Sequence, residues 1–197
     1  MRTVDIQAKK RLILDAACRV LVKRGFQEFV LDEVAQEAGV AKGTLFLYYK
    51  SKDDLFSSAF ADLVDQLGAS LDAVLASETA GLPLLTDAVR AILGHFDRNR
   101  DFLSQFAAGK FPACGTKSNS MLMGKYQDNT RRMTLILRKC AEGGLFKPKD
   151  FSFESLALLG LCRSAMLTQV IHGSRHPLEK EVNKIVEFFL HGIGGKK

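Results

Sequence analysis

The sequence predicts an all-α fold in which a small amino-terminal three-helix domain precedes a larger helical domain. Apolar residues recur at three- and four-residue steps along most of the 197 residues, as they do on one face of a helix. Glycines and prolines stand between these periodic stretches, where helices end and turns form. Because no stretch alternates apolar and polar residues in the manner of a strand, we expect no sheet.

Three helices are expected in the amino-terminal domain. The first covers residues 6–24, and Gly25 follows where a left-handed cap is favoured. The second covers residues 31–38 and stops at Gly39, and the third covers residues 42–49. The second and third helices are therefore joined by a turn of only three residues.

The remaining helices belong to the larger domain. Ser51, with Asp54 three residues later, forms an acidic variant of the capping box and predicts a long helix that runs to about Ala76. Residues 111–120 collect Pro, Gly and Ser and are expected to form a loop. The other predicted helices cover residues 83–98, 101–108, 120–142, 152–171 and 178–191. We place the domain boundary after Lys52, which gives domains 1–52 and 53–197.

Composition indicates a soluble cytoplasmic protein. Hydrophobic residues make up 47% of the chain, enough for a sizeable core. The first residues do not resemble a signal segment, and no apolar run approaches the roughly 20 residues of a membrane span, so we expect no membrane partner. The four cysteines show no paired spacing, which favours reduced thiols over disulfides or a zinc site.

Positive charge is concentrated at the amino terminus. Residues 1–52 carry ten Lys and Arg against six Asp and Glu, whereas residues 53–197 carry eighteen against sixteen. The first quarter of the chain is thus the better candidate for binding a polyanion. A solvated basic face would give the same count, so charge alone does not decide the matter.

The third helix has two different faces. Helical spacing puts Leu45 and Tyr49 on one side, where we expect them in the core together with Phe46. Leu47 and Tyr48 fall on the other side, near the lysines of the stretch GVAKGTLFLYYKSK. Two helices joined by a short turn, with polar and basic groups outward on the second, form a helix-turn-helix whose second helix fits the major groove of DNA. Two short helices around a glycine also occur in ordinary bundles.

The stretch GFQEFVLDEVAQEAGVAKGTLFLYYKSKDDLF, residues 25–56, resembles the DNA-binding segment of the TetR family of bacterial transcription regulators. The resemblance implies double-stranded DNA as a partner, a ligand-binding and dimerisation domain in the rest of the chain, and repression as the mode of regulation. It also implies a DNA-binding surface, made of Lys42, Gly43, Thr44, Leu47, Tyr48, Lys50 and Lys52. By position, Thr44, Tyr48 and Lys52 match phosphate contacts, and Lys42, Gly43 and Leu47 match base or groove contacts. Lys52 solvating the next helix and Gly43 permitting close approach are the structural alternatives.

The chain departs from the family pattern at three hydroxyl-bearing positions. Val30, Ala41 and Phe46 stand where the family commonly has Thr, Ser and Tyr. Val30 cannot accept a hydrogen bond from the first amides of the second helix, and a lost N-cap typically costs about 1 kcal/mol. Asp32 offsets part of this cost through the helix dipole. We therefore expect DNA binding to depend more strongly on lysines.

A helix-turn-helix of this kind binds DNA as a two-fold homodimer, so a dimer surface is expected elsewhere. Two apolar stripes in the last two helices are the candidates, and small residues in the first stripe allow close helix approach. The proposed interface comprises Phe153, Leu156, Ala157, Gly160, Leu161, Ser164, Leu167, Val182, Ile185, Val186 and Phe189. The alternative is that both stripes face only the core of their own chain.

The middle of the chain is rich in Phe and Met, which are typical both of cores and of pockets for apolar ligands. We expect a pocket for a small apolar or aromatic effector there, with four polar residues as anchors. Its predicted lining comprises Phe96, Phe106, Met121, Tyr126, Asn129, Thr130, Met133, Met166 and Gln169. Ligand binding would favour a conformer that releases the palindromic operator.

Other functions are poorly supported by the sequence. His172 and His176 flank a glycine in a loop and lack a third ligand, so we expect no metal. Cys114 is more simply an unreactive loop thiol than a redox sensor. No nucleophile, base and orienting group can be assembled, so we expect neither an enzyme nor a cofactor. The main alternative is a DNA-anchored adaptor whose carboxy-terminal domain binds a protein.

Overall fold

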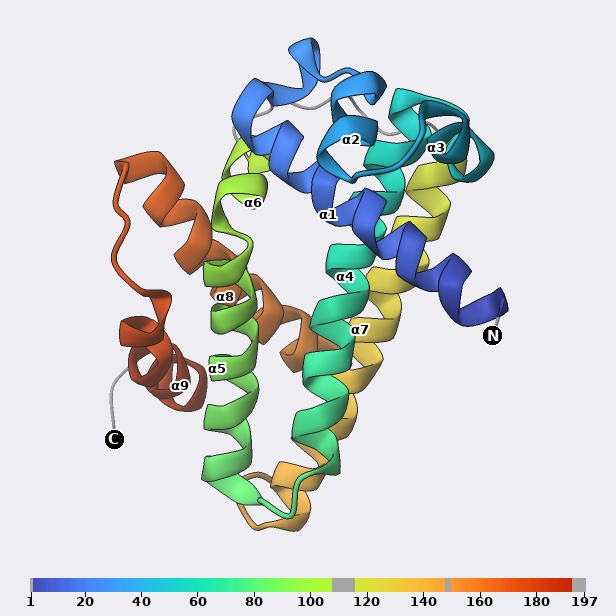
Figure 1. The fold of residues 1–197 in the computed structure, drawn as a ribbon. Coiled ribbons are helices and arrows are strands. Elements are labelled where there is room, and N and C mark those ends of the chain that lie inside the picture. The colour runs from blue at the N-terminus through green and yellow to red at the C-terminus, as the bar shows by residue number, and fades with distance from the viewer. Residues whose placement is uncertain (1, 108–115, 148–149, 193–197) are drawn as a thin grey trace. The chain divides into compact units, whose positions relative to one another are not determined.

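The computed structural model describes residues 2–107, 116–147 and 150–192, with side chains for residues 6–103, 121–147 and 150–192. Every regular element in these described ranges is a helix, which confirms the predicted all-α class (Figure 1). The chain divides into two compact units. Unit 1 contains the described residues of 1–64 and 101–122, and unit 2 contains those of 65–100 and 123–197. The predicted functional boundary after Lys52 stays a prediction.

Unit 1 begins with the three expected helices. They are α1 (Arg2–Glu28), α2 (Leu31–Glu37) and α3 (Lys42–Tyr48). Gly25 interrupts α1 with a φ of 73°, a conformation that residues with a Cβ rarely adopt, so the helix bends where the sequence predicted its end. Gly39, with a φ of 67°, makes the turn between α2 and α3.

Helix α4 (Lys52–Ala76) runs from unit 1 into unit 2. The Ser51 hydroxyl accepts a hydrogen bond from the Asp54 amide at 3.1 Å, and the Asp54 carboxylate accepts one from the Lys50 amide at 2.8 Å. The first bond satisfies an amide that the helix itself leaves unpaired, and the second ties the residue before the cap to the first turn. The predicted capping arrangement is confirmed, with the carboxylate bonded one residue earlier than in the usual box.

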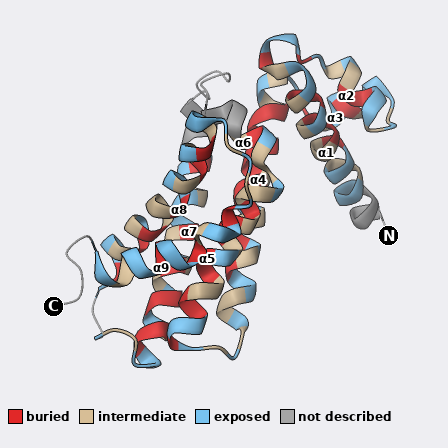
Figure 2. Cartoon of the chain, turned by 90° about the vertical axis from the view of Figure 1, so that its left-hand side faces the viewer, coloured by how far each residue is buried: buried red, intermediate tan, exposed pale blue. Residues whose placement is uncertain are grey.

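The core of unit 1 is formed by the inner faces of its helices. Ile13, Leu21, Val34 and Leu45 are fully buried there. Figure 2 shows buried positions on one side of each helix and exposed positions on the other. Helix α6 (Arg100–Ala107) adds Phe102, whose ring lies 6.1 Å from that of Phe56 in α4. Packing of these apolar faces stabilises helices that are too short to be stable alone.

Unit 2 contains the remaining helices together with the second half of α4. They are α5 (Gly81–Arg98), α7 (Thr116–Glu142), which begins in unit 1, α8 (Ser152–His172), the 3₁₀ helix η1 (Leu178–Glu181) and α9 (Val182–His191). Helix α5 contacts α8, η1 and α9. Its inward face is continuous and apolar, from Leu84 to Leu93.

The sequence was wrong about the start of α7. Residues 111–120 were expected to form a loop from their Pro, Gly and Ser content, but residues 116–120 are helical, and residues 111–115 lie outside the described ranges. Polar side chains favour turns only weakly, and the helical surroundings override that preference here. The first turn of the predicted helix at 178–191 is also different, because residues 178–181 form a 3₁₀ turn.

A polar seam with a seven-residue repeat joins α4 to α7, which lie side by side in Figure 1. Lys125 reaches Asp65 at 2.5 Å, and Arg132 reaches Asp72 at 2.8 Å. One heptad further on, Lys139 donates to the Leu75 carbonyl at 3.1 Å, at the end of α4. Because both partners advance together along the chain, the two helices run parallel in unit 2.

Candidate DNA-binding surface and effector domain

Helix α3 carries the candidate DNA-binding surface. Leu45 is fully buried and Tyr49, which follows the helix, is 5% exposed, so both belong to the core as predicted. Leu47 is 74% exposed, and Lys42 and Gly43 are exposed beside it. The helix therefore has one side in the core of unit 1 and one side in solvent.

The other predicted DNA-binding residues lie on α3 or just after it. Thr44 and Tyr48 are half-buried, and Lys50 is exposed. Lys52, the first residue of α4, is half-buried. Phe46 was expected in the core but is 37% exposed. The prediction for Phe46 is therefore wrong, because its position falls between the two faces of a helix only seven residues long.

The starts of α2 and α3 lack side-chain caps. Val30 and Ala41 occupy the N-cap positions in extended conformations, and neither makes a side-chain capping bond. This confirms the consequence expected at Val30. The α3 terminus is instead closed by backbone bonds from the Thr44 and Leu45 amides to the Ala41 carbonyl.

Lys42 and Lys50, the exposed lysines of the surface, have partners within the chain. The Lys42 ammonium lies 2.7 Å from the Asp32 carboxylate, and both side chains are more than 60% exposed. Such a surface ion pair contributes little stability, so phosphate can replace the carboxylate at small cost. The Lys50 ammonium donates to the Phe46 carbonyl at 3.2 Å. Lys10 of α1 lies 5.9 Å from the centre of the Tyr48 ring.

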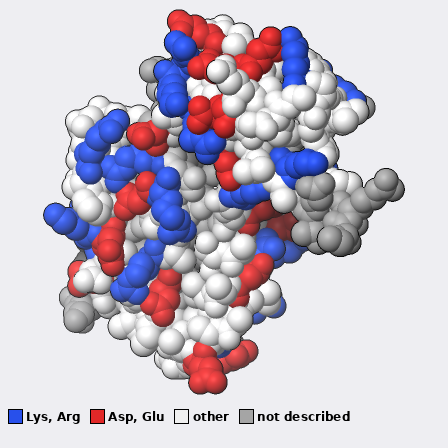
Figure 3. All heavy atoms as spheres, in the orientation of Figure 1, with Lys and Arg blue, Asp and Glu red and all other residues white. Residues whose placement is uncertain are grey.

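The face drawn in Figure 3 has Lys and Arg side chains interspersed with Asp and Glu. Unit 1 contains ion pairs such as Arg19 with Glu37 at 2.8 Å and Arg24 with Glu33 at 3.3 Å. The hydrogen bond from Arg19 and the nearby charge of Lys23 hold the pKa of the Glu37 carboxyl below its usual value, Arg19 being the stronger influence. Any attraction for a polyanion must therefore be local to a few residues.

Most of the predicted effector residues belong to unit 2, whereas Phe106 and Met121 belong to unit 1. Phe96 and Thr130 are half-buried, and the Phe106 side chain lies outside the described residues. Met121 and Tyr126 of α7 are 43% and 45% exposed. The buried members come from α7 and α8 and comprise Asn129, Met133, Met166 and Gln169.

Two predicted polar anchors are hydrogen-bonded inside the chain. The Asn129 side-chain oxygen accepts a bond from Arg132 at 3.2 Å and lies where a Cβ on Gly68 would come within 2.9 Å. The Gln169 amide donates to the His176 carbonyl at 2.8 Å. An effector that used either group would have to replace these bonds.

A cavity of about 290 Å³ lies between α8 and the η1–α9 segment. Its lining comprises Leu161, Ser164, Ala165, Thr168, Gln169, His176, Glu181, Lys184, Ile185 and Phe188. Of the predicted effector residues only Gln169 takes part, whereas Leu161, Ser164 and Ile185 were predicted at the dimer surface. The loop residues were missed because no periodic pattern marks them.

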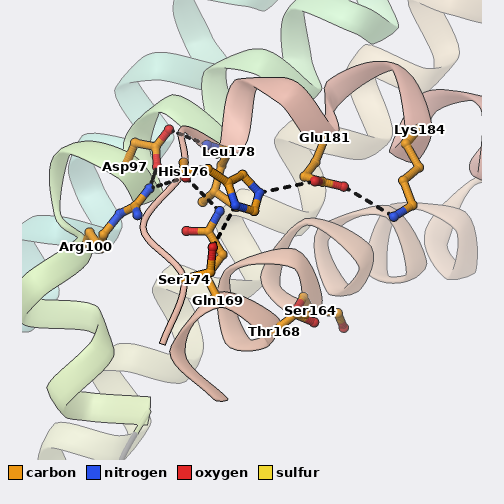
Figure 4. Close-up of polar contacts among 10 residues, drawn as sticks. All are labelled: Asp97, Arg100, Ser164, Thr168, Gln169, Ser174, His176, Leu178, Glu181 and Lys184. Carbon is orange, nitrogen blue, oxygen red and sulfur yellow. Dashed lines mark hydrogen bonds and ion pairs between the residues drawn. The ribbon is translucent and has the colours of Figure 1, made fainter. Parts of the chain in front are cut away.

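Hydrogen bonds fix the loop at one end of this cavity (Figure 4). The His176 ring lies between Ser174, at 2.7 Å, and Glu181, at 3.3 Å. Asp97 of α5 accepts a bond from the Leu178 amide at 2.8 Å, and Arg100 donates to the His176 carbonyl at 3.0 Å. The described residues contain no group of three metal-binding side chains around His176 or elsewhere.

The predicted dimer residues fall into two classes. Those of α8 are exposed or half-buried, with Phe153 77% and Leu156 59% exposed. Those of α9 lie deeper, since Val182, Ile185 and Val186 are buried in their own chain. Phe189 is half-buried, and its ring packs edge to face against Phe146. The exposed stripe of the predicted surface therefore belongs to α8.

Helix α8 also has the length and composition of a membrane span, although only 28% of its apolar window is buried. From the sequence we expected no run of this kind, and that expectation is wrong by length and composition alone. An apolar, largely exposed helix of this kind requires some apolar neighbour.

Three described cysteines are unreactive. Burial raises the pKa of Cys18 and of Cys162 to about 12 and that of Cys140 to about 11, so each remains a thiol at neutral pH. All three are free in the structure. Cys114 lies outside the described residues.

Comparison with known proteins gives consistent matches. A family model described as "Bacterial regulatory proteins, tetR family" matches residues 13–59. The fatty acid metabolism regulator protein of Bacillus subtilis (strain 168) is 23% identical over 194 residues, which cover 93% of this chain and 95% of that protein.

Solved structures match over nearly the whole chain. The fatty acid degradation regulator FadR from Bacillus halodurans has a TM-score of 0.81 at 19% identity, covering 95% of this chain and 97% of that one. FadR from Bacillus subtilis in complex with stearoyl-CoA has a TM-score of 0.78 at 20% identity, covering 93% and 98%. At these identities the similarity is one of fold.

Proposed function

We propose that this chain, which belongs to the TetR family of transcriptional regulators, is a cytoplasmic repressor that binds a palindromic operator as a homodimer and is released by a long-chain fatty acyl-CoA. The observation that carries the DNA-binding part is the pair Leu45 and Leu47. Two residues apart on one short helix, the first is fully buried and the second is 74% exposed. An apolar side chain held out beside lysines suits the major groove, where thymine methyls and phosphates lie close together.

In this proposal Thr44 and Tyr48 bind phosphate oxygens through their hydroxyls, and Lys50 neutralises a phosphate. Lys42 exchanges the Asp32 carboxylate for DNA, while Gly43 allows the backbone to approach closely. The exposed Leu47 contacts base edges. Each role follows from the exposure of the side chain and from the family resemblance of its position.

The exposed stripe of α8 forms the centre of the proposed dimer interface. Phe153, Leu156, Gly160 and Ser164 are spaced on one side of that helix, opposite the buried Leu158 and Cys162. Small side chains in the stripe allow a second α8 to pack closely. A dimer also supplies two reading helices for half-sites about 34 Å apart.

The choice of effector rests on the relatives and on the composition of unit 2. FadR from Bacillus subtilis, which has a similar fold, was solved with stearoyl-CoA, and the relative described as a fatty acid metabolism regulator comes from the same species. Buried Met133 and Met166, with half-buried Phe96, are flexible or aromatic apolar groups suited to an acyl chain. The relatives are regulators, which favours a role in binding over catalysis.

The test begins with selection of bound fragments from random duplex DNA by the purified protein. Recovery of a palindrome, with binding lost in Leu47→Ala and Tyr48→Ala together, is the expected result. Leu135→Ala is the matched control, since Leu135 is 46% exposed on α7 and far along the chain from α3. Sequence-independent binding that is unchanged in the double variant would contradict the proposal.

The effector is then tested on the selected operator by fluorescence anisotropy. Stearoyl-CoA should release the DNA, whereas free CoA and stearate at the same concentration should not. If none of the three changes DNA binding or the melting temperature of the protein, the acyl-CoA proposal fails. The adaptor alternative, in which the carboxy-terminal domain binds a protein, would then be favoured.

A further inference from the structure

Lys52 differs from the other lysines of the DNA-binding surface in what surrounds its ammonium group. The Lys52 ammonium lies 4.4 Å from the centre of the Phe26 ring and 5.9 Å from that of Phe29. It also donates a hydrogen bond to the Gln27 carbonyl at 3.2 Å. All of these partners belong to residues 25–29, which we call the aromatic turn and which comprise the last turn of α1, after its bend at Gly25, and the residue that follows it.

Phe26 is held by two residues of α4. The ring of Phe56 meets that of Phe26 edge to face at 5.3 Å and 74°. Lys52 and Phe56 are four residues apart and therefore lie on the same side of α4. One helix turn thus presents an ammonium and an aromatic ring to a single phenylalanine, whose side chain is only 8% exposed.

The start of α2 needs such an external support. Val30, its N-cap, makes no side-chain capping bond, so the terminus is not fixed locally. The aromatic turn immediately precedes Val30, and Gly25 gives the turn its bend with a φ of 73°. Fixing the turn to α4 therefore fixes the start of α2, on which α3 packs.

The same contacts leave Lys52 less suited to phosphate than its neighbours. Lys42 and Lys50 are exposed, whereas Lys52 is half-buried, with a carbonyl and two aromatic faces around its ammonium. A lysine at the first turn of a helix is also unfavourable toward the helix dipole, and the aromatic rings compensate for this.

We propose that Lys52 is a positioning residue, which ties the aromatic turn to α4 and so orients α2 and α3, and that it does not neutralise a DNA phosphate. This assigns to Lys52 a role other than the one implied by the family resemblance. The expected effect of Lys52 on DNA affinity rests on the proposed function, in which the protein binds an operator. The contact with Phe26 can be tested without DNA.

The first experiment measures melting temperatures in a double-variant cycle. Lys52→Met keeps the aliphatic stem and removes the ammonium, and Phe26→Leu removes the ring. We expect each single variant to melt about 2–4 °C below wild type. The melting temperature of the double variant should fall by less than the sum of the two single shifts. Additive shifts would show that Lys52 and Phe26 do not act together and would overturn the contact.

The second experiment measures DNA affinity against salt well below the melting temperatures, for the operator and for an unrelated duplex. A positioning role predicts that Lys52→Met weakens operator binding about 5- to 10-fold, with an unchanged slope of log K against log salt. Binding to the unrelated duplex should be unaffected. Lys52→Arg, whose guanidinium can stack on Phe26, should restore operator affinity.

Lys50→Met is the matched control, because it removes the same charge two residues away. It should lower the magnitude of the salt slope by about 1.8 per dimer. The same fall in slope for Lys52→Met would overturn the proposal in favour of a phosphate contact. A lower melting temperature with unchanged operator affinity would also overturn it, because Lys52 would then serve stability alone. Failure of the wild-type protein to bind DNA would instead contradict the proposed function.

Discussion

Helices α3 and α8 both expose large apolar residues, but in different surroundings. On α3, Leu47 is 74% exposed and stands among Lys42, Lys50 and the hydroxyls of Thr44 and Tyr48. On α8, Phe153 and Leu156 are 77% and 59% exposed in a helix that is apolar along most of its length. An exposed apolar residue flanked by cations suits a polyanion that carries methyl groups. A continuous apolar stripe suits another apolar surface.

The comparison teaches that exposure alone does not identify a partner. The chemistry of the neighbouring side chains does, because it determines which groups the partner must present. On α3 the buried residue next to the exposed one shows that the helix is anchored. On α8 the buried Leu158 and Cys162 on the inner side have the same role.

The largest expected effect comes from the buried member of the α3 pair. Leu45→Ala removes a fully buried side chain from the core of unit 1 and should lower the free energy of unfolding by about 2–5 kcal/mol. Leu47→Ala should change it by less than about 0.5 kcal/mol but weaken operator binding. Urea denaturation followed by circular dichroism distinguishes them. Equal destabilisation by both would show that α3 has no free side.

The next effect tests the stripe of α8. Leu156→Glu places a charge at the centre of the proposed interface and should lower the dimer association constant by about 30- to 1,000-fold. Sedimentation equilibrium measures this constant. Leu135→Glu, at an exposed position of α7, is the control and should leave association unchanged. If Leu156→Glu also associates normally, the dimer surface lies elsewhere.

Lowering the pH should protonate a buried group of unit 2 and so reduce stability, whereas the buried titratable groups of unit 1 should not respond. Burial lowers the pKa of His95 in unit 2 to about 4, and Arg98 contributes to this shift. The pKa of His95 is lower in the folded state than in the unfolded state. The contribution of neutral His95 to the free energy of unfolding is therefore fully present above pH 6.5 and is lost as pH falls toward 4. The loss should be about 2–3 kcal/mol, measured as the difference in unfolding free energy between wild type and His95→Gln across that range.

Unit 1 should respond differently at its own buried titratable groups. Burial raises the pKa of Cys18 and Tyr49 to about 12, so neither changes protonation between pH 4 and 6.5. His95→Gln should therefore reduce the acid sensitivity of unit 2 without altering that of unit 1. An identical pH dependence in wild type and variant would contradict the assignment to His95.

The two regions also differ in how far the sequence predicted them. The candidate DNA-binding residues are close in sequence, so the helical period alone puts Leu45 inside and Leu47 outside. The cavity beside α8 joins residues from 161 to 188 through a loop, and no local pattern predicts that His176 and Glu181 lie at its rim. On α8 the predicted stripe includes Leu156, which is exposed, and omits Leu158, which is buried on the other side of the helix. It did not show that Val182 and Val186 of α9 face their own core, because either packing gives the same stripe.

The smallest effect tests whether α2 depends on a local cap or on the aromatic turn. Val30 is 53% exposed at the N-cap, so Val30→Thr adds a hydroxyl acceptor while disturbing little buried surface. If the cap is simply missing, thermal denaturation should show a gain of about 0.5–1 kcal/mol. If Val30→Thr stabilises the Lys52→Met variant but does not stabilise the wild-type protein, the contact between Lys52 and Phe26 already fixes the start of α2. A loss in both would mean that the apolar side chain of Val30 contributes more than a cap can.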